Sequence, residues 1–243
     1  MAIDLHRFAN PARFLRITSA IFPWAAIVTV LLLAVGLYLA LFVSPEDYQQ
    51  GQTVRIMFVH VPAAWMAMSI YIMMAISSAT GLIWKHPVAD LSAKAAAPIG
   101  ACFTFLALVT GSLWGQPMWG TYWVWDARLT SMLILFFLYL GYMGIWGSFD
   151  DQSKAARAAA ILVLIGAINV PIIKFSVDWW NTLHQPASVA TMDGPKIHSS
   201  ILTPLLVMSL AYTSLFLTIF IIRVKAEILG RRLRILRLAN LEE

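Results

Sequence analysis

Long apolar stretches alternate with short polar segments along this chain. Six stretches contain no Asp, Glu, Lys or Arg: 21–43, 56–84, 95–125, 129–149, 158–173 and 197–222. A helix needs about 20 apolar residues to cross a bilayer core of about 30 Å. Five stretches meet that length alone, and the other reaches it if Lys174 snorkels to the membrane surface. We therefore predict an all-α, polytopic membrane protein with six transmembrane helices.

The predicted spans belong to one integral membrane domain that covers residues 1–243. We place them at about 21–43, 57–84, 95–114, 129–149, 157–177 and 198–222. The stretch 158–173 contains Asn169 and Pro171, which indicate a kink or a broken helix in the fifth span. The first span is too long for the apolar region of a signal peptide, and we expect it to be retained.

The composition excludes two other classes of protein. Only 12% of the residues are charged and 60% are hydrophobic, and the mean hydropathy is +0.76. A soluble domain carries about 25% charged residues, and a disordered chain has few apolar ones. The composition therefore agrees with the membrane protein that the apolar stretches predict.

The basic residues predict the orientation in the membrane. Of the 17 Lys and Arg residues, all but Arg55, Arg128, Lys174 and Lys196 lie at the termini or in the second and fourth loops. Basic residues concentrate on the cytoplasmic side, so both termini should be cytoplasmic. The basic tail, residues 223–243, interleaves leucines with arginines, which is typical of an interfacial amphipathic helix or of a contact with a cytoplasmic partner. The net charge of +5 is explained by anionic headgroups without nucleic acid.

Tryptophans gather in the third loop, on the outer side. The chain has 10 tryptophans, and the predicted outer loop 114–128 contains Trp114, Trp119, Trp123 and Trp125 beside Tyr122. We expect Gly115, Pro117 and Gly120 to break the helix there. An aromatic belt at the membrane interface is one interpretation. Because the rings are so concentrated, we favour a flat aromatic platform for a large planar ligand.

The five histidines divide between the two faces. His6 and His86 fall on the cytoplasmic side, where we expect them to be solvated. His60, His184 and His198 fall on the outer side. Imidazole nitrogen is the common axial ligand of haem iron, so His60 and His184, which flank the tryptophan-rich loop, are the candidate metal ligands. His198 has no aromatic neighbours in sequence and ranks behind them.

Three charged residues lie beside these groups on the outer side. Asp126 directly precedes the fourth span, where it could cap the helix or contribute to the ligand site. Arg55 and Arg128 could clamp carboxylates of the ligand. Haem carries two propionates, which fits such a clamp.

Three motifs in order resemble one protein family. Trp-Gly-Thr-Tyr-Trp-Val-Trp-Asp at 119–126 is similar to the tryptophan-rich (WWD) signature of haem-handling membrane proteins of cytochrome c biogenesis. The continuation Ala-Arg-Leu-Thr at 127–130 resembles the smaller branch of that superfamily, the haem exporter protein C or cytochrome c maturation protein C (CcmC) family. Phe-Val-His-Val-Pro-Ala-Ala-Trp at 58–65 and Trp-Trp-Asn-Thr-Leu-His-Gln-Pro at 179–186 also resemble it.

The resemblance implies a role in haem transport. Such a protein holds haem b transiently at the periplasmic face of the bacterial inner membrane, with His60 and His184 as axial ligands. The tryptophan-rich loop contacts the haem and a periplasmic haem chaperone that receives it. The implied partners are the ATP-binding and membrane subunits of an ABC transporter and a small single-span membrane subunit.

Two other functions compete with haem delivery. A b-type cytochrome would keep a redox haem permanently, but it usually places its histidines inside the bundle, and no span here carries one near its middle. A permease could use the predicted break near Asn169, but no span has an acidic residue or arginine at mid-depth. The chain also has no P-loop pattern and no hydrolytic constellation, so ATP hydrolysis would come from partners.

Overall fold

The chain folds into a bundle of long helices. The computed structural model describes residues 10–185, 188–189 and 194–240. The α-helices are α1 (Pro11–Tyr38), α2 (Met57–Trp84), α3 (Pro87–Trp119), α4 (Ala127–Ser148), α5 (Gln152–Gly166), α6 (Asn169–Trp179) and α7 (Ser199–Ala239). A π-helical segment, η2 (Leu39–Val43), extends α1, and a 3-10 helix, η3 (Gln52–Ile56), leads into α2.

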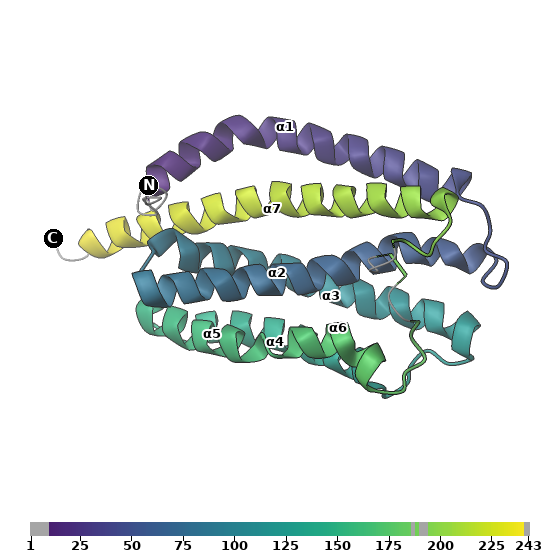
Figure 1. Ribbon diagram of the computed structural model, residues 1–243. Helices are drawn as coiled ribbons and strands as arrows, with labels where there is room; N and C mark the ends of the chain where they lie inside the picture. Colours follow the sequence, from purple (N-terminus) through teal and green to yellow (C-terminus); the bar gives the residue numbers. More distant parts are fainter. Residues whose placement is uncertain (1–9, 186–187, 190–193, 241–243) are drawn as a thin grey trace.

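Six helical segments of the described chain are long and apolar enough to cross a membrane. Helices α5 and α6 together form the fifth of them. This confirms the all-α fold with six spans. The helices lie lengthwise beside one another, and the start of α1 and the end of α7 lie at the same end (Figure 1). The opposite end, which we call the site end, carries η3, the α3–α4 loop and the C-terminal turn of α6.

The centre of the bundle is a tightly packed junction of α2, α3 and α4. The rings of Tyr71 and Tyr139 meet edge to face with centroids 5.1 Å apart, and both side chains are fully buried. The Tyr139 hydroxyl donates a hydrogen bond of 2.7 Å to the Ala67 carbonyl. Its ring lies directly on Gly100 of α3, where any Cβ would overlap it. Small residues let helices approach closely in membranes, so this junction holds α2 and α3, the helices that carry His60 and its partners, in register.

Helix α1 lies at the edge of the bundle and packs chiefly on α7 (Figure 1). The Thr29 hydroxyl is 2.8 Å from Ser214 Oγ and 2.9 Å from Thr218 Oγ1, both on α7. Hydrogen bonds between hydroxyls are a common means of joining helices in an apolar environment. Helix α1 is thus joined to α7 by hydroxyl groups as well as by apolar contact.

The helix before the tryptophan-rich loop is longer than the sequence suggested. Gly115 and Pro117 were expected to break it, and this was wrong, because α3 continues through both to Trp119. The helix ends at Gly120, whose φ of 76° is left-handed and whose N–H bonds to the Gln116 carbonyl at 2.9 Å. Glycine adopts this conformation without steric cost. Only residues 120–126 are therefore a loop, and Trp114 and Trp119 project from a helix.

The fifth span is broken rather than kinked at Pro171. Residues 167–168 interrupt it, and α6 begins at Asn169. Pro171 thus lies in the first turn of α6, where an N–H has no partner within the helix and its loss costs nothing. The Asn169 side chain donates a hydrogen bond of 2.8 Å to the Ser131 carbonyl of α4. The break is therefore anchored to α4, and it makes α6 a separate short segment near the site end.

The basic tail continues the sixth span. Helix α7 runs without interruption from Ser199 to Ala239, and its residues 231–239 are exposed. The Arg234 guanidinium donates a hydrogen bond of 3.0 Å to the Asp150 carbonyl in the α4–α5 loop. The tail is thus an extension of the bundle along α7, not a separate helix.

Candidate functional site

His60 lies in the first turn of α2 and is held by α3. Its Nδ1 is 3.0 Å from the Ala107 carbonyl oxygen and 3.2 Å from Thr110 Oγ1. A carbonyl only accepts hydrogen bonds, so Nδ1 carries the proton in this arrangement. Because a neutral imidazole has one N–H, Nε2 keeps a free lone pair. His60 thus keeps Nε2 available as an acceptor, the arrangement that a metal-binding imidazole needs.

The His60 ring fits into a gap on α3. A Cβ on Gly111 would come within 2.8 Å of its Cε1 atom, so glycine leaves the room that the ring needs. The Trp114 ring meets it edge-on, with centroids 5.7 Å apart and planes at 71°. Trp114 is itself fixed by its Nε1–H, which donates to Gln50 Oε1 at 3.1 Å. The orientation of His60 is therefore defined by α3 on several sides.

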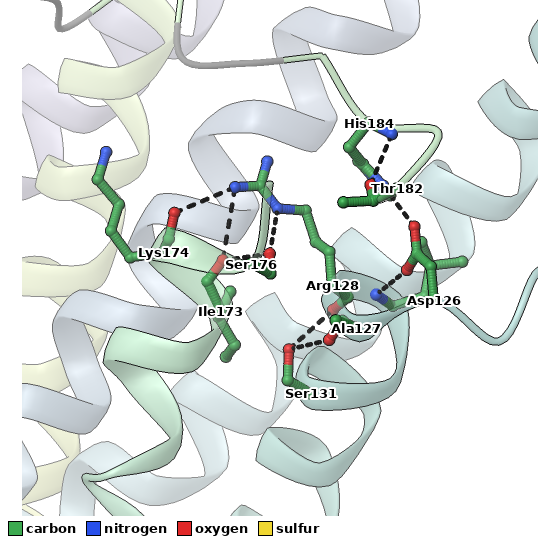
Figure 2. Close-up of polar contacts among 10 residues, drawn as sticks. Asp126, Ala127, Arg128, Ser131, Ile173, Lys174, Ser176, Thr182 and His184 are labelled. Atoms are coloured by element: carbon green, nitrogen blue, oxygen red, sulfur yellow. Dashed lines mark hydrogen bonds and ion pairs between the residues drawn. The ribbon is translucent and has the colours of Figure 1, made fainter. Parts of the chain in front are cut away.

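His184 comes from the segment that follows α6. Its Nδ1 lies 3.4 Å from Asp126 Oδ2, and its backbone N–H donates to Thr182 Oγ1 at 2.8 Å (Figure 2). The Trp119 ring meets the imidazole at 65° with centroids 4.9 Å apart. A carboxylate also only accepts hydrogen bonds. His184 thus directs its N–H toward Asp126 and keeps Nε2 free, as His60 does.

Asp126 performs two structural tasks at once. It is the N-cap of α4, where its Oδ1 accepts the Leu129 N–H at 2.8 Å. Its Oδ2 faces His184, and only 9% of its side chain is exposed, compared with 19% for His184. Burial lowers the pKa of His184, while the Asp126 carboxylate opposes that shift and Arg128 adds to it. Burial thus favours the neutral form of His184, which is the form that binds a metal.

The two histidines belong to one site. The His60 ring meets Trp114 and the His184 ring meets Trp119, and these two tryptophans lie five residues apart on α3. Arg128 in turn lies near Asp126 and Asp178. The fold therefore brings together the two predicted axial ligands, Asp126 and Arg128.

Arg128 joins α4 to α6. Its Nε donates to Ser176 Oγ at 3.2 Å, and one Nη group donates to the carbonyls of Ile173 and Lys174 at 3.4 and 3.3 Å. Figure 2 shows the guanidinium reaching toward α6 while the neighbouring Asp126 faces His184. Within the described chain, the other Nη group has no recorded hydrogen bond. Arg128 is thus mainly a link between helices, with one amino group left for an anion.

Five buried side-chain groups lack a hydrogen-bond partner among the described residues, and two of them belong to η3 and the α3–α4 loop. These two are the Nε of Arg55, on η3, and the indole Nε1 of Trp123, in the loop; the others belong to Tyr71, Trp146 and Arg223. A buried N–H without an acceptor is unfavourable by about 1–3 kcal/mol. Both are therefore suited to a ligand that brings acceptors, such as a carboxylate.

The predicted flat platform does not form from the whole loop. The rings of Trp123 and Trp125 are 77° apart, with centroids separated by 5.4 Å, so both cannot lie flat on one planar ligand. Trp114 and Trp119 each meet a histidine edge-on. Tyr122 and Trp125 face outward and are 59% and 77% exposed. Trp114 and Trp119 thus support the histidines, Trp123 is partly buried and Trp125 lies at the surface.

Sequence reasoning missed the residues that support the ligands. Thr110 and Gly111 hold and accommodate His60, Gln50 fixes Trp114, and Ser176 accepts from Arg128. One signal was available, because Thr110 and Trp114 are four residues apart and share a helix face. No pattern in the sequence indicated the Ala107 carbonyl or Ser176, because they meet His60 and Arg128 only through the packing of different helices.

These groups fit a haem. Two imidazoles with free Nε2 atoms can take the axial positions of the iron. The unpartnered donors of Arg55 and Trp123, with the Arg128 guanidinium beside them in the site, can receive propionates. The fold and the site thus define a polytopic membrane protein with a paired-histidine, haem-compatible site at one end of its bundle.

Comparison with known proteins identifies the family. The family model described as "Heme exporter protein C" matches residues 4–239. A "Heme exporter protein C" of Bradyrhizobium diazoefficiens is 62% identical over 236 residues, which cover 97% of this chain and 88% of that protein. The protein of the same name from Escherichia coli strain K12 is 56% identical over 181 residues, 74% of each chain. A "Putative cytochrome c biosynthesis ccmC-like mitochondrial protein" of Marchantia polymorpha is 52% identical over 199 residues, 82% of this chain and 84% of that one. This chain belongs to the Heme exporter protein C family.

Proposed function

We propose that this protein binds haem b transiently between His60 and His184 and delivers it to a periplasmic haem chaperone. Membership of the Heme exporter protein C family supports a role in haem handling for cytochrome c maturation. The haem is the cargo, and its own iron and vinyl groups supply the chemistry of transfer. The protein binds it, orients it and releases it.

The observation that carries this proposal is the matched state of the two histidines. Each directs Nδ1 toward an acceptor that cannot donate, the Ala107 carbonyl for His60 and the Asp126 carboxylate for His184. Each therefore presents Nε2 toward a ligand. Two imidazoles prepared in the same way, beside Trp114 and Trp119 of one helix, suit bis-histidine ligation.

The remaining site residues supply orientation. Arg55 and the free amino group of Arg128 receive the propionates, and the indole N–H of Trp123 adds a third donor. Trp114 and Trp119 hold the imidazole rings. The exposed rings of Tyr122 and Trp125 line the surface that meets the chaperone.

A transient site suits this placement. His184 lies outside the helices and His60 in the first turn of α2, so the haem sits at the end of the bundle rather than in its core. A b-type cytochrome, which retains its haem, is less compatible with such a site. The break between α5 and α6 is closed by Asn169 and Ser131, which supports an anchored helix end rather than a permease path.

The proposed setting is the bacterial inner membrane, with the site end facing the periplasm and both termini in the cytoplasm. The bias of basic residues supports this orientation. The proposed partners are the chaperone, the ATP-binding and membrane subunits of an ABC transporter, and a small single-span membrane subunit. The family name, which describes an exporter, supports an association with a transporter.

Spectroscopy of haem added to the purified protein tests the ligands. The wild type should give a low-spin, bis-imidazole spectrum, and His60→Ala and His184→Ala should each abolish it. His198→Ala is the matched control, because His198 caps α7 and is exposed. A low-spin spectrum that survives both His60→Ala and His184→Ala would refute the assignment.

Delivery is tested by co-purification with the chaperone. Trp125→Ala should retain haem and its low-spin spectrum while it loses the chaperone, because Trp125 is exposed and does not contact a histidine. Trp84→Ala is the control. Trp84 is 53% exposed and is the last residue of α2, at the opposite end of the bundle from the site. Equal chaperone binding by wild type and Trp125→Ala would contradict the proposed surface.

A further inference from the structure

The two candidate ligands differ in the group that holds their Nδ1. His184 faces a carboxylate, that of Asp126, whereas His60 faces the neutral carbonyl of Ala107 and the hydroxyl of Thr110. We infer that Asp126 is a positioning residue that acts on haem through His184 and makes His184 the stronger of two unequal axial donors. This inference rests on the proposed function, and it replaces a direct contact between Asp126 and haem.

Each oxygen of the Asp126 carboxylate already has a partner within the protein. Its Oδ1 accepts the Leu129 N–H at 2.8 Å and its Oδ2 faces His184 Nδ1 at 3.4 Å. The side chain is only 9% exposed, and its backbone is fixed as the N-cap of α4. A negative group would also repel the propionates. Asp126 is therefore placed to orient a histidine, not to bind an anionic ligand.

The chemistry of the two partners predicts unequal ligands. An imidazole whose N–H donates to a carboxylate is a more basic ligand than one whose N–H donates to a neutral carbonyl. A more basic ligand stabilises ferric iron more than ferrous iron. His184 thus binds iron more strongly through Nε2, and it lowers the reduction potential of the bound haem. His60 supplies the weaker bond, in a pocket formed by Gly111 and Trp114.

The substitution Asp126→Asn isolates this effect. Asparagine caps a helix as well as aspartate does, so the bond from Leu129 is retained. The second side-chain atom becomes an NH₂ group, which only donates, and His184 loses its acceptor. We expect haem affinity to fall by about 10–100-fold and the midpoint potential of bound haem to become more positive.

The matched control is Asp151→Asn. Asp151 is also an N-cap aspartate, at the start of α5, where its Oδ1 accepts the N–H groups of Ser153 and Lys154. No histidine faces it in the described structure. This variant should keep the wild-type affinity and potential, which separates the effect on His184 from the loss of a capping charge.

The outcomes distinguish this inference from the proposed function. An Asp126→Asn protein with wild-type affinity and potential would overturn the inference, provided that the wild-type spectrum depends on His60 and His184. A wild type without that dependence would overturn the proposed function instead. If Asp126→Asn does not fold, nitrogen NMR of the histidine rings in the haem-free wild type tests the inference instead, because it shows which ring nitrogen carries the proton. A proton on Nδ1 of His184 is expected, and a proton on Nε2 would overturn the inference.

Discussion

The Nε of Arg128 donates a hydrogen bond to Ser176 Oγ, 3.2 Å away, and so ties the first turn of α4 to α6. Helix α6 is separated from α5 by residues 167–168 and is followed by the segment that carries His184. The Arg128 contact therefore holds the piece of chain that carries His184, one of the two proposed ligands. Asp126, two residues before Arg128, holds the same ligand directly.

Removing either partner of this contact should have different effects. Ser176→Ala takes away one acceptor and leaves the carbonyls of Ile173 and Lys174, so we expect a loss of about 1 kcal/mol in stability with haem binding retained. Arg128→Ala removes all these bonds and the amino group that is left for a propionate, and haem binding should weaken as well. Thermal unfolding in detergent and haem titration measure the two effects. Equal haem affinity in both variants would argue against a ligand role for Arg128.

The gap for His60 can be closed by one methyl group. Gly111→Ala puts a Cβ within 2.8 Å of the His60 ring, so the imidazole must move and the low-spin spectrum should be lost or weakened. Gly144→Ala is the control, because no atom lies within 4 Å of its added Cβ and alanine favours a helix. A wild-type spectrum in Gly111→Ala would show that the His60 position is not restricted by α3.

The stability of the haem-free protein should fall in mild acid. Burial lowers the pKa of His184 below its ordinary value of 6.5, despite the opposing carboxylate of Asp126. Between the folded and unfolded values the unfolded chain binds more protons, so stability rises with pH in that window. The contribution of neutral His184 to the stability is complete above about pH 6.5. It is lost as the pH falls toward the pKa of His184 in the folded protein. Thermal unfolding between pH 7.5 and about 5 should show this decrease, and His184→Gln should reduce it. An identical decrease in that variant would assign the effect to other groups.

Labelling of single cysteines should reveal the orientation. In a Cys102→Ser background, Tyr48→Cys places a thiol at an exposed position between η2 and η3, at the site end. Ser148→Cys places one at the exposed end of α4, at the other end of the bundle. An impermeant maleimide should label the first in spheroplasts and the second only after permeabilisation. The reverse pattern would place the site end in the cytoplasm.

Some features of this protein follow from local sequence. A bilayer core accepts only long apolar helices, so the charge-free stretches determine that six spans exist, and Gly120 determines where α3 ends. The N-cap role of Asp126 is also local, since an aspartate before a helix accepts its first N–H groups. The sequence also predicted which residue types form the site, because the two histidines flank the tryptophan-rich loop along the chain.

Only the tertiary structure decided how those residues are used. The acceptors that set the protonated nitrogen of each histidine are the Ala107 carbonyl of α3 and the Asp126 carboxylate before α4, which lie in other segments of the chain. The Arg128 guanidinium, expected to clamp a ligand, was found to bind mainly α6. The physical reason is that a hydrogen bond requires two groups within about 3 Å in suitable orientation. Sequence periodicity reports which face of a helix a residue occupies, but the packing of helices determines which partner it meets.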